Sequence, residues 1–165
     1  MKTDAGIWGR ATIKLLGPEG NLKFYEVHDN LITDFGDEYY ARMGANVSPP
    51  TAVTRMQLGT GTTDPTKTST IEGFISGSGV VFTGKTVAAV GTNTGWKITY
   101  SASWGAGVAD NGAITKACIT SQTSSTTAAV AGNTISVVEF SAINKGASDT
   151  LVINWDHTFY DNPSA

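Results

Sequence analysis

The sequence predicts a mainly β fold, an antiparallel β-sandwich of jelly-roll-like form with one short helix near residues 33–43. Three observations lead to this prediction. Seven or eight short segments alternate apolar and polar residues, which is the pattern of strands with one buried face. Segments rich in Gly, Ser, Asn and Pro separate them, as turns require. Charged residues make up only 15% of the chain, whereas a protein of long helices would be rich in Ala, Glu, Lys and Leu.

The first elements form a predicted hairpin. Residues 7–16 alternate, with aliphatic side chains at every second position, so we expect a strand with one buried face. Residues 17–21, Gly-Pro-Glu-Gly-Asn, have the composition of a turn. Alternation resumes at residues 22–28, and the two strands are therefore expected to pair.

One segment, residues 33–43, has the three- and four-residue spacing of an amphipathic helix. Its apolar stripe consists of Ile32, Phe35, Tyr39 and Met43. Thr33 can cap the first turn, and Gly44 is expected to end the helix in the left-handed conformation. Gly36 weakens the helix interior by about 1 kcal/mol relative to Ala, so we expect packing to compensate.

From residue 52 onward, every further element is predicted to be a strand. The predicted strands are residues 53–58, 80–90 with an interruption at Gly84, 96–104, 113–120, 134–143 and 150–160. Alternation with one polar face favours antiparallel pairing. Three connecting loops are long and polar, at residues 47–52, 59–79 and 121–133, and loops of such length in a small domain are uncommon unless they are functional or disordered.

A length of 165 residues fits one domain. We predict that residues 1–165 form a single β-sandwich domain with an N-terminal arm, residues 1–6, and a hairpin–helix sub-region, residues 7–50. The first residues lack the apolar segment of a secretory signal, and no apolar run reaches 18 residues, so we expect a soluble product of a cytoplasm with no membrane partner. A net charge of −3 with 11 scattered Lys and Arg residues argues against nucleic acid as a partner.

The reactive side chains do not form a recognisable catalytic or metal-binding pattern. His157 lies on the apolar face of the last predicted strand, and its neighbour Asp156 points to the opposite face, so the two cannot bind one ion together. His28 ends a strand, and Cys118 is expected to be a buried, inert thiol. None of the 14 acidic residues lies in the setting of a sugar hydrolase. We therefore predict no catalytic, cofactor-binding or metal-binding residue, no cofactor and no enzymatic activity.

Two loops share some features with known ligand-binding loops. Residues 58–63, Leu-Gly-Thr-Gly-Thr-Thr, resemble a phosphate-binding loop, but Asp64 and Pro65 follow in place of a Lys and a helix. We expect a structural loop in which glycine permits positive φ. Residues 110–112, Asp-Asn-Gly, lack the further acids of a calcium loop and are expected to form a hairpin turn.

Three aromatic side chains, Trp96, Tyr100 and Trp104, share one face of the clearest strand at spacings of about 13 Å. If that face is exposed, it is a platform for stacking on sugar rings; if it is covered, it is core. The polar opposite face, with Lys97 and Thr99, favours the core interpretation.

Several segments resemble small virion proteins of tailed bacteriophages. These segments are residues 30–36, Asn-Leu-Ile-Thr-Asp-Phe-Gly, residues 56–65, with Leu-Gly-Thr-Gly-Thr, and residues 143–155, with Lys-Gly-Ala-Ser-Asp-Thr-Leu before the final strand. A fourth match runs from Trp96 through Thr115, and together the resemblance covers most of residues 30–160. It implies a structural component of the virion, assembled in the host cytoplasm, and its motifs contain no catalytic residue.

The resemblance leaves the head or the tail open as the location. We expect a capsid decoration (cement) protein that binds the major capsid protein and stabilises joints between capsid subunits. Decoration proteins often act as trimers, so copies of this chain are expected as partners. The alternative is a tail-fibre or baseplate adhesin that binds a host-surface glycan through exposed aromatic residues. On the decoration hypothesis, the arm at residues 1–6 or the loop at residues 59–79 becomes ordered on contact with the capsid.

Overall fold

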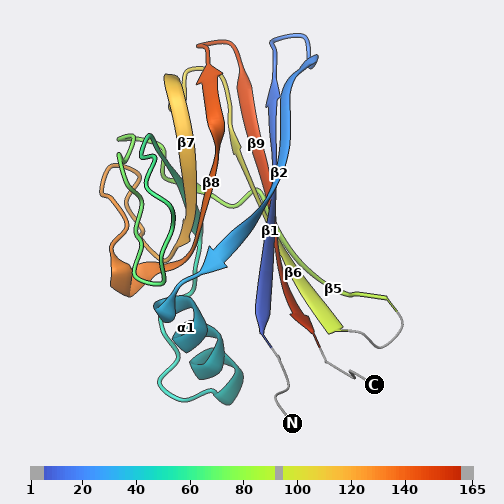
Figure 1. Cartoon of the computed structure of the whole chain (residues 1–165), viewed down its shortest axis with the longest axis vertical. Coiled ribbons are helices and arrows are strands. Elements are labelled where there is room, and N and C mark those ends of the chain that lie inside the picture. The colour runs from blue at the N-terminus through green and yellow to red at the C-terminus, as the bar shows by residue number, and fades with distance from the viewer. Residues whose placement is uncertain (1–5, 92–94, 161–165) are drawn as a thin grey trace.

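The computed structural model describes residues 6–91 and 95–160 (Figure 1). Within these residues it contains one curled sheet of nine strands and one α-helix, and every strand pair is antiparallel. In chain order the elements are β1 (Ile7–Leu16), β2 (Leu22–Ile32), α1 (Asp34–Ala45), β3 (Arg55–Gly59), β4 (Val80–Val81), β5 (Gly84–Ala89), β6 (Gly95–Trp104), β7 (Asn111–Thr120), the short 3₁₀-helix η1 (Ala131–Asn133), β8 (Thr134–Lys145) and β9 (Thr150–Tyr160). The expected N-terminal arm lies outside the described residues, except for Gly6, which is exposed.

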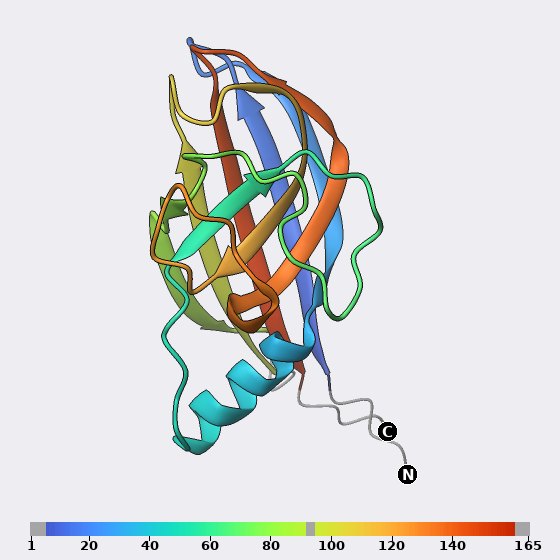
Figure 2. The same cartoon turned by 90° about the vertical axis from the view of Figure 1, so that its left-hand side faces the viewer.

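The mainly β, antiparallel architecture is confirmed, but the strands form one continuous half-barrel in the order β4-β3-β7-β8-β2-β1-β9-β6-β5, and the expected two-layer sandwich is not observed. The reason lies in β2, which serves both halves of the sheet. It pairs with β1 over most of its length, and its last residues, Leu31 and Ile32, then pair with β8. Figures 1 and 2 show how the sheet curves around this strand.

The two margins of the sheet approach each other at Phe82 and Thr83, which connect β4 to β5. The N–H of Phe82 donates to the carbonyl of Thr54, just before β3 (3.0 Å). The N–H of Thr83 donates to the carbonyl of Ser101 in β6 (2.8 Å). The segment from β4 to β5 therefore links the first and last strands of the curled sheet.

The core fills the inner face of this half-barrel. The largest fully buried apolar side chains are Trp104, Trp155, Ile13, Met56, Leu58, Ile114, Ile119, Ile135, Ile143, Leu151 and Ile153. They come from strands of both halves of the sheet, so the main core joins the two halves. Among the described residues, no helix combines the length and hydrophobicity needed to span a bilayer.

The hairpin, the helix and most later strands lie where the sequence predicts them, with boundary shifts of a few residues. The predicted interruption at Gly84 is wrong, because Gly84 begins β5 and the break between β4 and β5 lies at Phe82 and Thr83. The predicted cap is confirmed, because the Thr33 hydroxyl accepts a hydrogen bond from the N–H of Gly36 (3.0 Å). The predicted end of the helix at Gly44 is wrong. Asn46 takes the left-handed conformation (φ 53°), and its N–H donates to the carbonyl of Met43. Asn tolerates this conformation better than most residues do, so glycine is not required.

Helix α1 packs against the start of β8, and Gly36 is the contact point. A Cβ at Gly36 would lie 2.1 Å from the carbonyl oxygen of Ile135. The N–H of Thr33 donates to that same oxygen (3.0 Å), and the Thr33 hydroxyl donates to the carbonyl of Thr134 (2.5 Å). Gly36 is therefore tightly packed, which agrees with the expectation that packing compensates for glycine in the helix.

We predict opposite effects for two substitutions in α1. Gly36→Ala forces the helix away from Ile135 and should lower the free energy of unfolding by about 1–3 kcal/mol. Gly44→Ala should raise it by about 0.5–1 kcal/mol, because a Cβ there meets no atom within 4 Å and Ala favours the helix. Urea unfolding measures both. Equal effects of the two substitutions would contradict the proposed contact.

Candidate functional site

Two long loops cover the outer face of β3, β7 and β8, and we call them the loop layer (residues 60–79 and 121–133). Figure 2 shows both loops in front of these strands. The loops also contact each other, because the N–H of Gly77 donates to the carbonyl of Ser125 (2.9 Å). The third long connection, residues 47–52, joins α1 to β3 and is largely exposed.

A small second core lies between the loop layer and the sheet. Ile71 and Ala129 come from the two loops, and they pack with Cys118 of β7 and Val137 of β8, all four being buried. Phe74 packs against this group. The loops are therefore anchored by apolar contacts as well as by polar ones.

Gln57 of β3 binds the backbone of the loop at residues 121–133. Its side chain is fully buried, its amide nitrogen donates to the carbonyl of Thr127 (2.8 Å), and its amide oxygen accepts from the N–H of Ala129 (2.8 Å). One side chain thus satisfies backbone groups of the loop that have no strand partner.

The loop at residues 58–63 packs against Glu72, and the expected reason for its glycines is wrong. Neither Gly59 nor Gly61 has a positive φ. Both are needed for close approach, because a Cβ at Gly59 would lie 2.2 Å from the carbonyl oxygen of Glu72, and one at Gly61 would lie 2.2 Å from its carboxylate. The backbone agrees with this, since the N–H of Gly61 donates to the carbonyl of Glu72 (3.2 Å).

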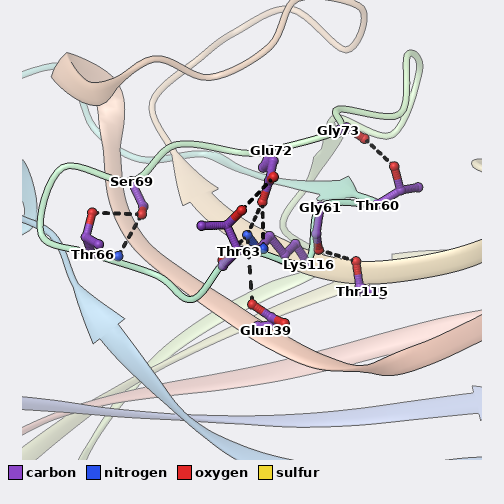
Figure 3. Close-up of polar contacts among 10 residues, drawn as sticks. All are labelled: Thr60, Gly61, Thr63, Thr66, Ser69, Glu72, Gly73, Thr115, Lys116 and Glu139. Atoms are coloured by element: carbon purple, nitrogen blue, oxygen red, sulfur yellow. Dashed lines mark hydrogen bonds and ion pairs between the residues drawn. The ribbon is translucent and has the colours of Figure 1, made fainter.

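Lys116 of β7 is the centre of the polar contacts beneath the first loop (Figure 3). Its side chain is 4% exposed, and its ammonium group donates to the carbonyl of Thr63 and to the carboxylate of Glu72. The carboxylate of Glu139, the residue opposite on β8, lies 3.9 Å away. A buried charge needs such partners, so Lys116 fixes the loop above it.

Glu72 completes this contact from the solvent side. Besides the bond from Lys116, its carboxylate accepts from the N–H (3.1 Å) and the hydroxyl (3.0 Å) of Thr63. The hydrogen bond from Lys116 and those from Thr63 lower the pKa of Glu72 below its ordinary value of 4.5. Because Glu72 compensates the charge of Lys116, this ammonium is not free to bind a phosphate, and the loop presents a fixed polar surface.

His157 is a buried core residue, as predicted. Its Nδ1 lies 2.6 Å from the hydroxyl of Tyr40, which in turn lies 2.9 Å from the hydroxyl of Tyr100. Burial lowers the pKa of His157 to about 3, so the ring is neutral near pH 7. The expectation that its polar atoms are all satisfied is met only in part, since Nε2 has no protein partner within the described chain. Asp156 faces the other way and accepts from Lys97 (2.9 Å).

The other candidates also have structural roles. Cys118 is buried beneath the loop layer, and burial raises its pKa to about 12, so the thiol is protonated at neutral pH. His28 is half-buried and lies 2.6 Å from the carboxylate of Glu26. Asp110 pairs with the buried Lys145 (2.6 Å). The expected hairpin turn at residues 110–112 is wrong, because β7 begins at Asn111 and the chain turns earlier, at residues 105–110. Within residues 6–91 and 95–160, no group of three or more His, Cys, Asp or Glu side chains could hold a metal ion.

The three aromatic residues on one face of β6 differ in burial. Tyr100 and Trp104 are buried, so the core interpretation is confirmed for them. Trp96 is 60% exposed at the far end of the strand, and there the core interpretation is wrong. The buried core residues of β6 begin at Tyr100, whereas Trp96 lies near the start of the strand, outside the core.

Sequence reasoning did not single out Gln57, Glu72 or Lys116. Lys116 carries a weak signal, since a lone charge stands within the apolar run of β7. Its partner Glu72 lies 44 residues away in a segment without periodicity, and no local pattern connects the two.

Comparison of the chain with protein-family models, with curated proteins and with solved structures gave no match.

We predict that the contact between Glu72 and Lys116 makes the loop layer sensitive to acid. Because the folded pKa of Glu72 is lowered, its contribution to stability is present above pH 4.5 and is lost as the pH falls below that value. Wild type should therefore be more stable than Glu72→Gln at neutral pH, and the difference should shrink on acidification. Unfolding midpoints measured across this range test it. His157 also titrates, but it does so in both proteins and cancels in the difference.

The control for this experiment is Asp64→Asn, which neutralises an exposed carboxylate of the same loop. Its difference from wild type should vary less with pH than that of Glu72→Gln. Proteolysis within residues 60–79 should become faster in Glu72→Gln at neutral pH. Curves that run parallel for wild type and Glu72→Gln at all pH values would contradict the assigned role.

Proposed function

We propose that the protein is a structural component of a bacteriophage virion, a capsid decoration (cement) protein that binds the major capsid protein on the outer shell. The sequence resemblance to small virion proteins supports this proposal. The chemistry of the described residues is consistent with it, because His157 and Cys118 are buried and the buried Lys116 is held by carboxylates.

The observation that carries the proposal is the loop layer. Two loops, residues 60–79 and 121–133, have a defined conformation that buried side chains of the sheet impose from below. A domain of this size does not need such loops for its core. A surface that is already fixed loses little conformational entropy when it binds, so it suits attachment to another protein. Ordering of residues 59–79 on contact is not needed for this mechanism.

The mechanism is non-covalent. A decoration protein seated across a joint between two capsid subunits adds buried surface to both, and a standard interface buries about 1,600 Å². A modest gain at each joint is multiplied over the many joints of a shell. On this proposal, the exposed Thr and Ser side chains of the loop layer supply hydrogen bonds, and Val130, which is 58% exposed, supplies an apolar contact.

We predict that Val130→Glu reduces binding to shells assembled from the partner capsid protein. A charge at an apolar contact should lower the affinity about tenfold or more, as measured by co-sedimentation. The matched control is Leu22→Glu, because Leu22 is also 58% exposed but lies at the hairpin end of β2, away from the loop layer. Equal binding of both variants would remove the loop layer as the interface. If the wild-type protein does not bind shells, the decoration function is wrong.

A second candidate is a tail-fibre or baseplate adhesin that binds a host-surface glycan, and the exposed ring of Trp96 favours it. On this hypothesis, Trp96→Ala should lower glycan affinity about two- to tenfold on a glycan array. The control is Trp8→Ala, because Trp8 is also partly exposed, at 36%, but alternates onto the opposite face of the sheet. Failure of the wild-type protein to bind any glycan would contradict the adhesin hypothesis.

A further inference from the structure

We propose that β5 is an association edge, along which the β5 strand of a second copy of this chain pairs antiparallel to give a two-fold symmetric dimer. The inference goes beyond the proposed function and does not depend on it, since the edge exists whatever the protein binds elsewhere.

Strand β5 ends the strand order of the sheet and pairs with β6 alone. All its residues after Gly84 are exposed. The N–H of Val90 donates to the carbonyl of Gly95 in the same ladder, so the alternation of an antiparallel pair directs the backbone groups of Thr86 and Ala88 towards β6. The N–H and C=O groups of Lys85, Val87 and Ala89 therefore point into solvent.

This edge has one charged residue, Lys85, but it lacks two other features that usually keep strand edges apart. Residues 84–89, Gly-Lys-Thr-Val-Ala-Ala, contain no proline, and their pairing with β6 is regular without a bulge. The opposite margin differs, because β4 has only two residues before the chain crosses to the other margin at Phe82 and Thr83. Of the two margins, only β5 presents a row of outward backbone groups long enough for strand pairing.

The sequence of β5 fits a copy of itself in one register. If Val87 lies opposite Val87 of the second copy, then Lys85 lies opposite Ala89 at both ends of the pair. Lys85, Val87 and Ala89 then each lie in a hydrogen-bonded pair with a residue of the second copy, so each of their outward N–H and C=O groups has a partner. The shift that would place Lys85 opposite Lys85 loses most of these bonds and brings like charges together, which disfavours it.

The side chains complement each other in the same register. Val87 is 65% exposed and neighbours Ile98 of β6, so two valines at the two-fold axis would join the apolar rows of both copies. Ala89 neighbours the exposed Trp96. The small Ala89 side chain leaves room for the Lys85 stem of the second copy to extend towards the Trp96 ring, where its ammonium group is favoured.

The first test is the mass of the full chain in solution, measured by sedimentation equilibrium over a wide concentration range. We expect reversible association of the 17.2 kDa chain into a species of twice that mass. Val87→Pro removes an N–H that the monomer leaves in solvent, so the fold should persist and the dimer should be lost. Val87→Lys places two charges together at the axis and should also abolish the dimer without any change to the backbone. Val130→Lys, at an exposed valine of the loop layer, should leave the dimer unchanged.

The second test fixes the register by cross-linking. In a hydrogen-bonded antiparallel pair the Cα atoms lie about 5.5 Å apart, within the range of a disulfide. Val87→Cys should therefore form a covalent dimer on mild oxidation, and the native Cys118 does not interfere because it is buried. Thr86→Cys is the matched control, since residue 86 faces residue 88 of the second copy and should cross-link poorly.

Each outcome decides the proposal. A wild-type chain that remains monomeric at the highest attainable concentration overturns it, as does a dimer that survives both Val87→Pro and Val87→Lys. More efficient cross-linking through residue 86 than through residue 87 overturns the register. A dimer that does not bind capsid shells would leave this inference intact and remove the decoration function, so the two failures are distinguishable.

Discussion

The chain segment from β4 to β5 imposes the constraint on which the rest of the structure depends, because it belongs to both margins of the curled sheet. Its first residues pair with β3, its last pair with β6, and between them the N–H groups of Phe82 and Thr83 bond to opposite sides of the gap. A sheet held in this curve encloses its inner face, so Trp104 and Trp155 are fully buried although no second sheet layer covers them. The same crossing shortens β4 and leaves β5 free along its outer edge.

An element can be predicted from the sequence when the residues that determine it are close together along the chain. The strand at residues 7–16 is visible in the sequence because alternation is a local property, and the Thr33 cap acts within one turn of the helix. The pairing of β2 with β8 joins residues about a hundred positions apart, so the half-barrel could not be distinguished from a sandwich. The buried contact between Lys116 and Glu72 was missed for the same reason. Trp96 shows the opposite case, in which local alternation is right but the core ends before the strand does.

Three glycines, Gly36, Gly59 and Gly61, permit close approach between elements, one in the helix and two at the loop layer. Gly36 brings α1 against the carbonyl of Ile135, and Gly59 and Gly61 bring β3 and the following loop against Glu72. Glycine is needed either where φ is positive or where a Cβ would collide with a neighbour, and the sequence looks the same in both cases. Assigning these glycines to positive φ from the sequence alone therefore fails. The distinction has a physical consequence: alanine at a close-approach site displaces a neighbouring element, whereas alanine at an open helical site such as Gly44 stabilises the helix.

The two surfaces to which we assign interactions lie on different parts of the half-barrel, and this separation determines what they could do together. The loop layer covers the outer face of β3, β7 and β8, whereas β5 forms the margin beyond β6 (Figure 1). Pairing through β5 therefore leaves the loop layer of each copy exposed. A dimer would present two such layers, and if both reach subunits of one shell, the second contact forms at a high effective concentration. Weak contacts through threonine and serine side chains would then suffice for stable attachment, without the large apolar patch that a single strong site requires.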